Sequence, residues 1–399
     1  MKSAPSADIN SSAMRFTTAV AAAAASCTST AIAYTPADTS GTDQLAAQGL
    51  ANLKAYEKTA NFTCSSETAN VRKEWNTLSE GDKKEYIDAV LCLQSKPAIS
   101  GALAPGAKSR YDDFVATHIN QTLSIHGTAN FLTWHRYFVQ TYETALRTEC
   151  NYTGYQPYLN WGRLALDPLN APVFSGTSTS MSSNGAYVNH SGAGVPSNET
   201  PFITVPPGQG GGCITSGPFR NMSVNLGPIS PALPSSLVPS NPQSDSLGYN
   251  PRCLRRDIST WAAETNLQDR NVTDLIVENG DVGEFQTLMQ GLFAQGLLGV
   301  HTAGHFLVGG DAGGDLFASP GDPYFFLHHA QIDRTYWIWQ NQQLSTRQYA
   351  LAGTLTLNNS PPSRNGTLDD VLELGVNAGP ITIREAMSTL GEGFCYIYE

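Results

Sequence analysis

Apolar residues recur at the spacing of an amphipathic helix along much of the chain. The clearest stretch is 130–149, where Phe131, Trp134 and Phe138 begin an apolar stripe that no glycine or proline interrupts. Weaker patterns of the same kind predict helical structure over 42–96, 110–120, 254–264, 271–278, 284–307 and 323–343. We therefore expect a mainly helical fold.

Regular structure is not expected everywhere. Thirteen of the 23 prolines lie in 167–253, together with many glycine, serine and asparagine residues. This composition interrupts helices and strands, so we expect long irregular loops there. The tail from 351 combines turns with one short strand-like run, Thr354–Leu357. We predict little β-structure.

The N-terminus differs from the rest of the chain. Residues 14–33 begin with Met-Arg, continue as an alanine-rich apolar run and end in Ala-Ile-Ala, the pattern of a secretory signal peptide. Residues 1–13 are polar and are interpreted as an extension that precedes this signal. We expect a secreted, extracellular protein in which residues 34–399 form a single domain.

Cysteines and sequons in residues 34–399 agree with export. An even number of cysteines in an exported chain is expected to form disulfides, and the candidates are Cys64, Cys92, Cys150, Cys213, Cys253 and Cys395. Cys213 and Cys253 flank one irregular segment and are the first pair that we predict, while Cys395 is expected to tether the tail. Glycosylation candidates are the sequons at Asn61, Asn120, Asn151, Asn189, Asn198, Asn221, Asn271, Asn358 and Asn365.

Charge and hydropathy exclude two classes of partner. The formal net charge is −11 and no basic run occurs, so the phosphate backbone of a nucleic acid would be repelled. Apolar stretches of membrane-spanning length are not found in 34–399, so we expect no membrane partner. The sequence does not indicate an oligomeric state.

Seven of the eight histidines fall in two groups. The first is His118, His126 and His135, the second is His301, His305, His328 and His329, and His190 stands alone. On a helix, His301 and His305 share one face, which is a metal-chelating spacing. A zinc protease would need glutamate at position 302, where this chain has threonine. Imidazole donors without interleaved carboxylates or thiolates suit copper or a three-histidine zinc site, and donor chemistry leaves both open.

Two longer motifs resemble those of a known family. FLTWHRYFVQTYETAL (131–146) resembles the first copper motif of the tyrosinase, catechol oxidase and haemocyanin family. HTAGH (301–305), followed by DPYFFLHHAQIDRTYWIWQ (322–340), resembles the second. Residues that match the second signature are Asp322, Pro323, Phe325, His329 and Asp333. The resemblance extends from about residue 42 to the end and is strongest to short, secreted fungal polyphenol oxidases.

The resemblance implies a fold, two metals and a reaction. The fold is a four-helix bundle that holds two copper ions between facing helices. Copper A is assigned to His118, His126 and His135, and copper B to His301, His305 and His329. The reaction is oxidation of o-diphenols to o-quinones, with weaker action on monophenols and O2 reduced to water. We expect O2 and small phenols as partners.

Several further residues are expected near the coppers. The pocket candidates are His328, Thr302, Phe306, Ala318, Gln290, Phe325 and Asp333. Only one histidine of an adjacent pair can easily face a target, so His328 is expected to line the pocket or to pack beside the site. Asp333 is expected either to orient a ligand imidazole or to pair with an arginine.

The chain also departs from patterns of this family. Many fungal tyrosinases have a cysteine two residues before the second copper A histidine, bonded to that ring, but here the residue is Ser124, so we predict no thioether. No C-terminal shielding domain is expected. Thr302 stands where efficient monophenolases often have asparagine. Gln290 aligns loosely with a position that often holds a water-orienting glutamate, and glutamine is a poor base. Ala318 is small enough to leave the pocket open. Together these residues favour diphenol oxidation.

Three alternatives remain. The first is a tailoring enzyme that oxidises or hydroxylates one secondary metabolite or a peptide tyrosine. The second belongs to the binding class and is a haemocyanin-like O2 carrier with the same ligands. The third is a copper-free relic, which the intact ligand sets disfavour.

Overall fold

The computed structural model of the protein describes residues 34–391 and 393–399, so the predicted signal peptide and extension lie outside the described residues. The helices are α1 (Ser40–Tyr56), α2 (Glu80–Ser95), α3 (Arg110–Ile125), α4 (Phe131–Cys150), α5 (Thr260–Asn266), α6 (Asp269–Glu278), α7 (Val282–Gln290), α8 (Val300–Val308), α9 (Tyr324–Gln342) and α10 (Leu344–Arg347). The fold is mainly helical, as predicted.

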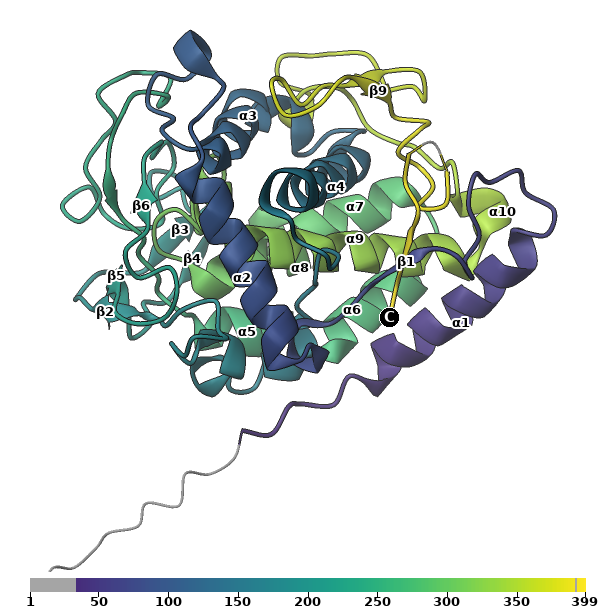
Figure 1. The fold of residues 1–399 in the computed structure, drawn as a ribbon, viewed down its shortest axis with the longest axis horizontal. Helices are drawn as coiled ribbons and strands as arrows, with labels where there is room; N and C mark the ends of the chain where they lie inside the picture. The colour runs from purple at the N-terminus through teal and green to yellow at the C-terminus, as the bar shows by residue number, and fades with distance from the viewer. Residues whose placement is uncertain (1–33, 392) are drawn as a thin grey trace, which may run out of the picture. The chain divides into compact units, whose positions relative to one another are not determined.

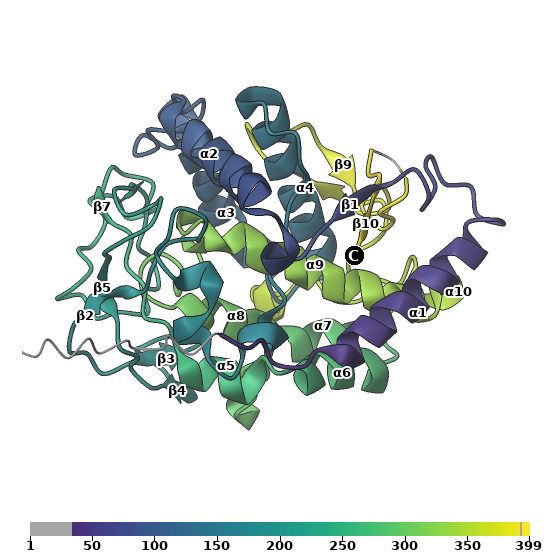
Figure 2. The same ribbon diagram turned by 60° about the horizontal axis from the view of Figure 1, so that its bottom comes forward.

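Four of these helices, α3, α4, α8 and α9, form the bundle that the resemblance implied. α4 packs against both α3 and α9, and α8 packs against α9. Figure 1 shows the arrangement of the helices, and Figure 2 shows α9 running through the middle, with α4 on one side and α6, α7 and α8 on the other. Every residue from Tyr324 to Asn341 is buried, so neighbours enclose α9 on all sides.

Local sequence explains where the bundle helices begin and what they bury. Ser109 and Asp112 form a capping box at the start of α3, which satisfies two backbone N–H groups. The apolar stripe predicted over 130–149 is α4, and its Phe131, Trp134 and Phe138 are buried. This buried face brings α4 against α9.

The strands are short and pair only in twos. They are β1 (Asn70–Arg72), β2 (Gly185–Tyr187), β3 (Ala193–Val195), β4 (Ile203–Val205), β5 (Gly211–Ile214), β6 (Ser223–Val224), β7 (Arg252–Cys253), β8 (Val371–Leu372), β9 (Ile381–Thr382) and β10 (Tyr396–Tyr398). β1 pairs with β10 in parallel, and the pairs β2–β5, β3–β4, β6–β7 and β8–β9 are antiparallel. Most of the strands belong to 167–253, which is otherwise irregular, as predicted.

Some element predictions were wrong in extent. The stretch 284–307 divides into α7 and α8, because Gly291 and Gly299 take left-handed φ angles of 116° and 72°. The stretch 42–96 contains turns and β1 between α1 and α2, and within 254–264 the helix begins only at Thr260.

The strand predicted over Thr354–Leu357 was also wrong. Thr354 forms one isolated bridge with Asn365, and a 3-10 turn begins at Leu357. Asn358 in that turn has a φ of 51°, which ends any extended conformation.

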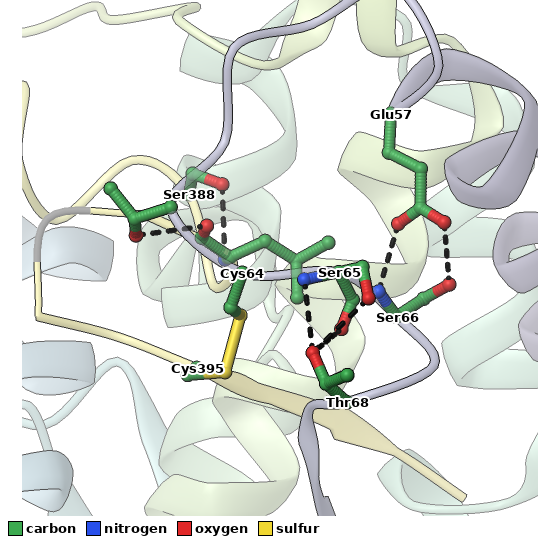
Figure 3. The surroundings of a disulfide bond; sticks show 9 residues. Glu57, Cys64, Ser65, Ser66, Thr68, Ser388 and Cys395 are labelled. Atoms are coloured by element: carbon green, nitrogen blue, oxygen red, sulfur yellow. Dashed lines mark hydrogen bonds between the residues drawn. A yellow bond between two sulfur atoms is a disulfide. The ribbon is translucent and has the colours of Figure 1, made fainter.

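Three disulfides join the six predicted cysteines. Cys213 pairs with Cys253, the pair expected first, and Cys92 pairs with Cys150. Cys64 pairs with Cys395 and so ties the tail to the segment after α1, as Figure 3 shows. Beside this bond the Glu57 carboxylate accepts from the backbone and hydroxyl of Ser66 at 2.8 and 2.9 Å.

In the described part of the chain, no helix has the length and apolar character that crossing a membrane requires.

Candidate metal centre

The first histidine cluster comes from α3, α4 and the loop between them. His118 lies on α3, His126 follows the last residue of that helix, and His135 lies on α4. All three are buried, and their ligand atoms lie within 4.8 Å of one another. The structure therefore brings together the three residues assigned to copper A.

Backbone carbonyls orient these three rings. The Nδ1 atoms of His118, His126 and His135 lie 2.7, 3.0 and 2.8 Å from the carbonyl oxygens of Phe317, Thr122 and Phe131. Each Nδ1 therefore donates its proton, which leaves Nε2 as the atom with a free lone pair. Within the described residues, none of the three Nε2 atoms has a hydrogen-bond partner. Ligand histidines are arranged in this way in metal sites.

The second cluster comes from α8 and α9. His301 and His305 lie one turn apart on α8, and His329 lies on α9. Nε2 of His305 lies 3.3 Å from that of His301 and 3.2 Å from that of His329. Two nitrogens that bind one ion at about 2.0 Å with near-tetrahedral angles stand about 3.3 Å apart. The cluster therefore has the spacing that a single ion needs.

Imidazole rings of the two clusters lie against one another. The rings of His135 and His329 stack with centroids 4.5 Å apart, and the rings of His126 and His301 lie 5.8 Å apart. Phe325 stacks on His329 at 4.1 Å and meets His118 edge-on at 5.3 Å. The donors and their burial thus fit two ions held side by side between facing helices.

Burial keeps these imidazoles neutral. It lowers the pKa of His126 to about 4 and that of His305 to about 3, and it lowers the pKa of each of the other five clustered histidines. Metal uptake at neutral pH therefore needs no proton release from these rings.

The metal-free protein should lose stability as pH falls from about 6.5 towards 4. In that range an unfolded histidine binds a proton that the buried ring cannot bind, so the unfolded state binds more protons and acid favours it. The check is the thermal midpoint of apoprotein at pH 7.5 and 4.5, for the parent chain and for His126→Gln. The variant should show a smaller pH dependence, and an equal dependence would contradict the lowered pKa.

His328 lies beside the second cluster, as expected from the sequence. Its ligand atom lies within 4.8 Å of those of His301, His305 and His329. Its ring packs against the backbone at Gly304, where a Cβ atom would come within 2.2 Å of it, and parallel to Tyr324. In 34–391 and 393–399 neither of its ring nitrogens has a hydrogen-bond partner.

Asp333 pairs with an arginine, which is the second of the two roles that the sequence suggested for it. Its Oδ1 accepts from Nε of Arg136 at 2.7 Å, and Oδ2 lies 3.5 Å from Arg72. Oδ2 also accepts the hydroxyls of Tyr396 and Tyr398 at 2.5 and 2.7 Å. The residue joins α9 to α4 and to the C-terminal strand β10.

Two cavities open onto the clusters. One of about 450 Å³ reaches His126 and His301, and one of about 70 Å³ reaches His301 and His305. Of the pocket candidates, Thr302 lines both, Gln290 lines the larger and Phe306 the smaller.

The role expected for Ala318 was wrong. This residue is fully buried, packs against Gly227 and lines neither of the two cavities. Leu316 and Phe293 line both cavities instead. They carry no sequence pattern of their own, so only the fold reveals them.

We expect the peptide that contains His126 to have its unmodified mass. Ser124, two residues earlier, is exposed and donates to the carbonyl of Gln121 at 2.9 Å. Each of the six cysteines in the described ranges is in a disulfide, so none is available for a thioether. Peptide mass spectrometry after reduction checks this, and a Cys–His crosslink would refute it.

The remaining candidates lie away from the clusters. Eight of the nine sequon asparagines are exposed, whereas Asn271 is half-buried and its Oδ1 accepts the backbone N–H of Gln268 at 2.9 Å. His190 lies 3.1 Å from the carboxylate of Asp257, outside both clusters.

Comparisons with known proteins agree with this geometry. Residues 108–342 match the common central domain of tyrosinase. The tyrosinase-like protein orsC of Emericella nidulans is 44% identical over 306 residues, which are 74% of this chain and 80% of that protein. N-acetyl-6-hydroxytryptophan oxidase ivoB of the same organism is 40% identical over 352 residues, 84% and 94% of the two chains. A variant of polyphenol oxidase from Thermothelomyces thermophila has a similar structure, with a TM-score of 0.81 and 39% identity, covering 90% of this chain and 98% of that one.

Proposed function

Because the chain belongs to the tyrosinase family of copper oxidases, we propose that it is a dinuclear copper polyphenol oxidase that converts o-diphenols to o-quinones with O2. The observation that supports this most is the pair of buried histidine clusters, in each of which three proposed ligand nitrogens converge without carboxylate or thiolate donors among the described residues. All-imidazole sites suit copper. Two bound coppers would relay electrons two at a time, so that oxidation of two diphenols to quinones supplies the four electrons and four protons that reduce one O2 to two waters.

The protein contributes placement and exclusion of water. Phe293 and Leu316 form apolar walls over His301, where they would hold an aromatic ring beside the metal ions. Phe325 contacts His118 of the first cluster and His329 of the second, and it lies on α9, which is buried along its length. The helices thus fix five of the six proposed donors before any metal binds, so the site is largely preorganised.

The cavity favours diphenols over monophenols. No carboxylate lines either cavity in the part of the chain that the structure describes. The Gln290 carboxamide bonds at both ends to backbone, to Gly127 N and to Gln286 O. A monophenol must lose its proton without a nearby base, whereas catechol ionises more readily at its first hydroxyl.

A second candidate is oxidation of one secondary metabolite. The relative ivoB is named for a hydroxylated tryptophan derivative, and a cavity of about 450 Å³ leaves room for more than a single ring. Uncharged polar side chains line much of it, including Gln286, Thr287 and Asn358. These groups suit a substrate with amide or hydroxyl substituents.

We also propose that the protein is exported. Three disulfides are typical of an oxidising compartment, and eight exposed sequons are accessible to glycosylation. N-glycosidase treatment should lower the mass of protein recovered from the culture medium.

One assay tests the proposed reaction. Copper-loaded and copper-free protein would be given catechol, phenol, an aminophenol and a methoxyphenol while O2 uptake is followed. We expect uptake with catechol to be fastest and to require copper. Absence of catechol turnover with two coppers bound would contradict the proposal, and much faster turnover of a single larger phenol would support the metabolite-specific alternative.

A further inference from the structure

His126 differs from the other proposed ligands in how the backbone that carries it is held in place. The other five lie within helices, whose backbone hydrogen bonds fix their positions. His126 instead follows α3 and opens the loop that leads to α4, with extended backbone at φ −123° and ψ 142°. Its own Nδ1 contact with Thr122 sets the ring orientation but not the course of the loop. The loop therefore needs tethers from elsewhere in the chain.

Gln290, the last residue of α7, supplies one of these tethers. Its Oε1 accepts the backbone N–H of Gly127, next to His126, at 2.7 Å. Its Nε2 donates to the carbonyl of Gln286 at 3.0 Å, which fixes the direction of the carboxamide. A side chain held at both ends is a rigid support for the loop.

The same residue also holds the second cluster. The carbonyl oxygen of Gln290 accepts the hydroxyl of Thr302 at 2.6 Å, and Thr302 follows His301 in the first turn of α8. Gly291 and Gly299 take left-handed angles between the two helices, so helical hydrogen bonds do not continue from α7 into α8. The Thr302 bond joins them across this break.

We propose that Gln290 is a positioning residue that ties the loop of His126 to the helix of His301 and so sets the spacing of the two metal ions. This inference rests on the proposed dinuclear copper function. The side chain of Gln290 acts on the first cluster and its backbone carbonyl acts on the second. The two effects can therefore be separated by mutation.

The experiment measures Co²⁺ affinity by competition with a chelator in proteins that keep one cluster. His329→Ala leaves the first cluster and His118→Ala leaves the second. Because Gln290 holds the residue next to a ligand, Gln290→Ala should weaken Co²⁺ binding about tenfold in the first background, the low end of the effect of outer-shell partners, and less than about twofold in the second. Thr302→Val should give the opposite pattern.

Two controls separate positioning from general destabilisation. Gln290→Glu keeps an acceptor for Gly127 N but loses the donor to Gln286 O, so its first cluster should bind Co²⁺ more tightly than that of Gln290→Ala and less tightly than that of the parent. Gln286→Ala removes an amide–carbonyl bond of the same kind, 2.8 Å to Ala352 O, one turn earlier on α7 and should leave Co²⁺ affinity unchanged. Equal losses for Gln290→Ala in both backgrounds, or none in either, would overturn the inference. Failure of both parent backgrounds to bind Co²⁺ would instead contradict the dinuclear site itself.

Discussion

Replacing His329 with alanine should remove the metal ion of the second cluster, whereas replacing the adjacent His328 should leave it in place. His329 Nε2 lies 3.2 Å from His305 Nε2, within the convergent set of three. The ring of His328 packs beside that set, between α8 at Gly304 and Tyr324. Outer-shell partners change metal affinity about 10–100-fold, so loss of a direct ligand should cost at least about 100-fold.

The measurement is copper content per chain after dialysis against a weak chelator. His329→Ala should retain one ion and lose O2 uptake with catechol. His328→Ala is the matched control, since it removes a buried imidazole from the neighbouring position of the same helix, and it should retain two ions. Loss of an ion from His328→Ala would instead show that His328 is a direct ligand of the second cluster.

The sequence could predict the elements that carry the ligands, because their local patterns are strong. The stripe that begins at Phe131 and Trp134 defined α4 almost to the residue, and the histidine groups marked the faces that meet. The break between α7 and α8 was missed because an apolar pattern runs through it. Gly291 and Gly299 interrupt the helix through their left-handed backbone angles. The spacing of apolar residues along the sequence carries no information about these angles.

Some contacts between distant segments could not be predicted from the sequence. Leu316 and Phe293 line the cavities because irregular segments bring them there, and residues of this kind are ordinary in any loop. Asp333 had two expected roles, and the choice depended on where Arg136 pointed and on how the C-terminal strand returned to α9. The direction of Arg136 and the path of the C-terminal strand are both set by tertiary packing, which local sequence patterns do not report.

Asp333→Ala should destabilise the fold by about 3–5 kcal/mol, because it leaves buried positive charge without its partner. Asp333 is 3% exposed and Arg136 is fully buried. The guanidinium keeps contacts with the carbonyls of Ala386 and Met387, but no other carboxylate replaces the lost one within the described residues. The tyrosines of β10 lose an acceptor at the same time.

Urea denaturation of the metal-free protein measures this cost apart from any metal binding. The control is Asp369→Ala, which breaks a pair with Arg384 whose side chains are 79% and 53% exposed. Water screens that pair, so its loss should cost less than about 1 kcal/mol.

Arg136 follows His135 directly and Asp333 lies one turn after His329, so the buried pair also joins the two helices that bring the clusters face to face. A cost for Asp333→Ala no larger than that of the control would mean that packing alone holds α4 against α9.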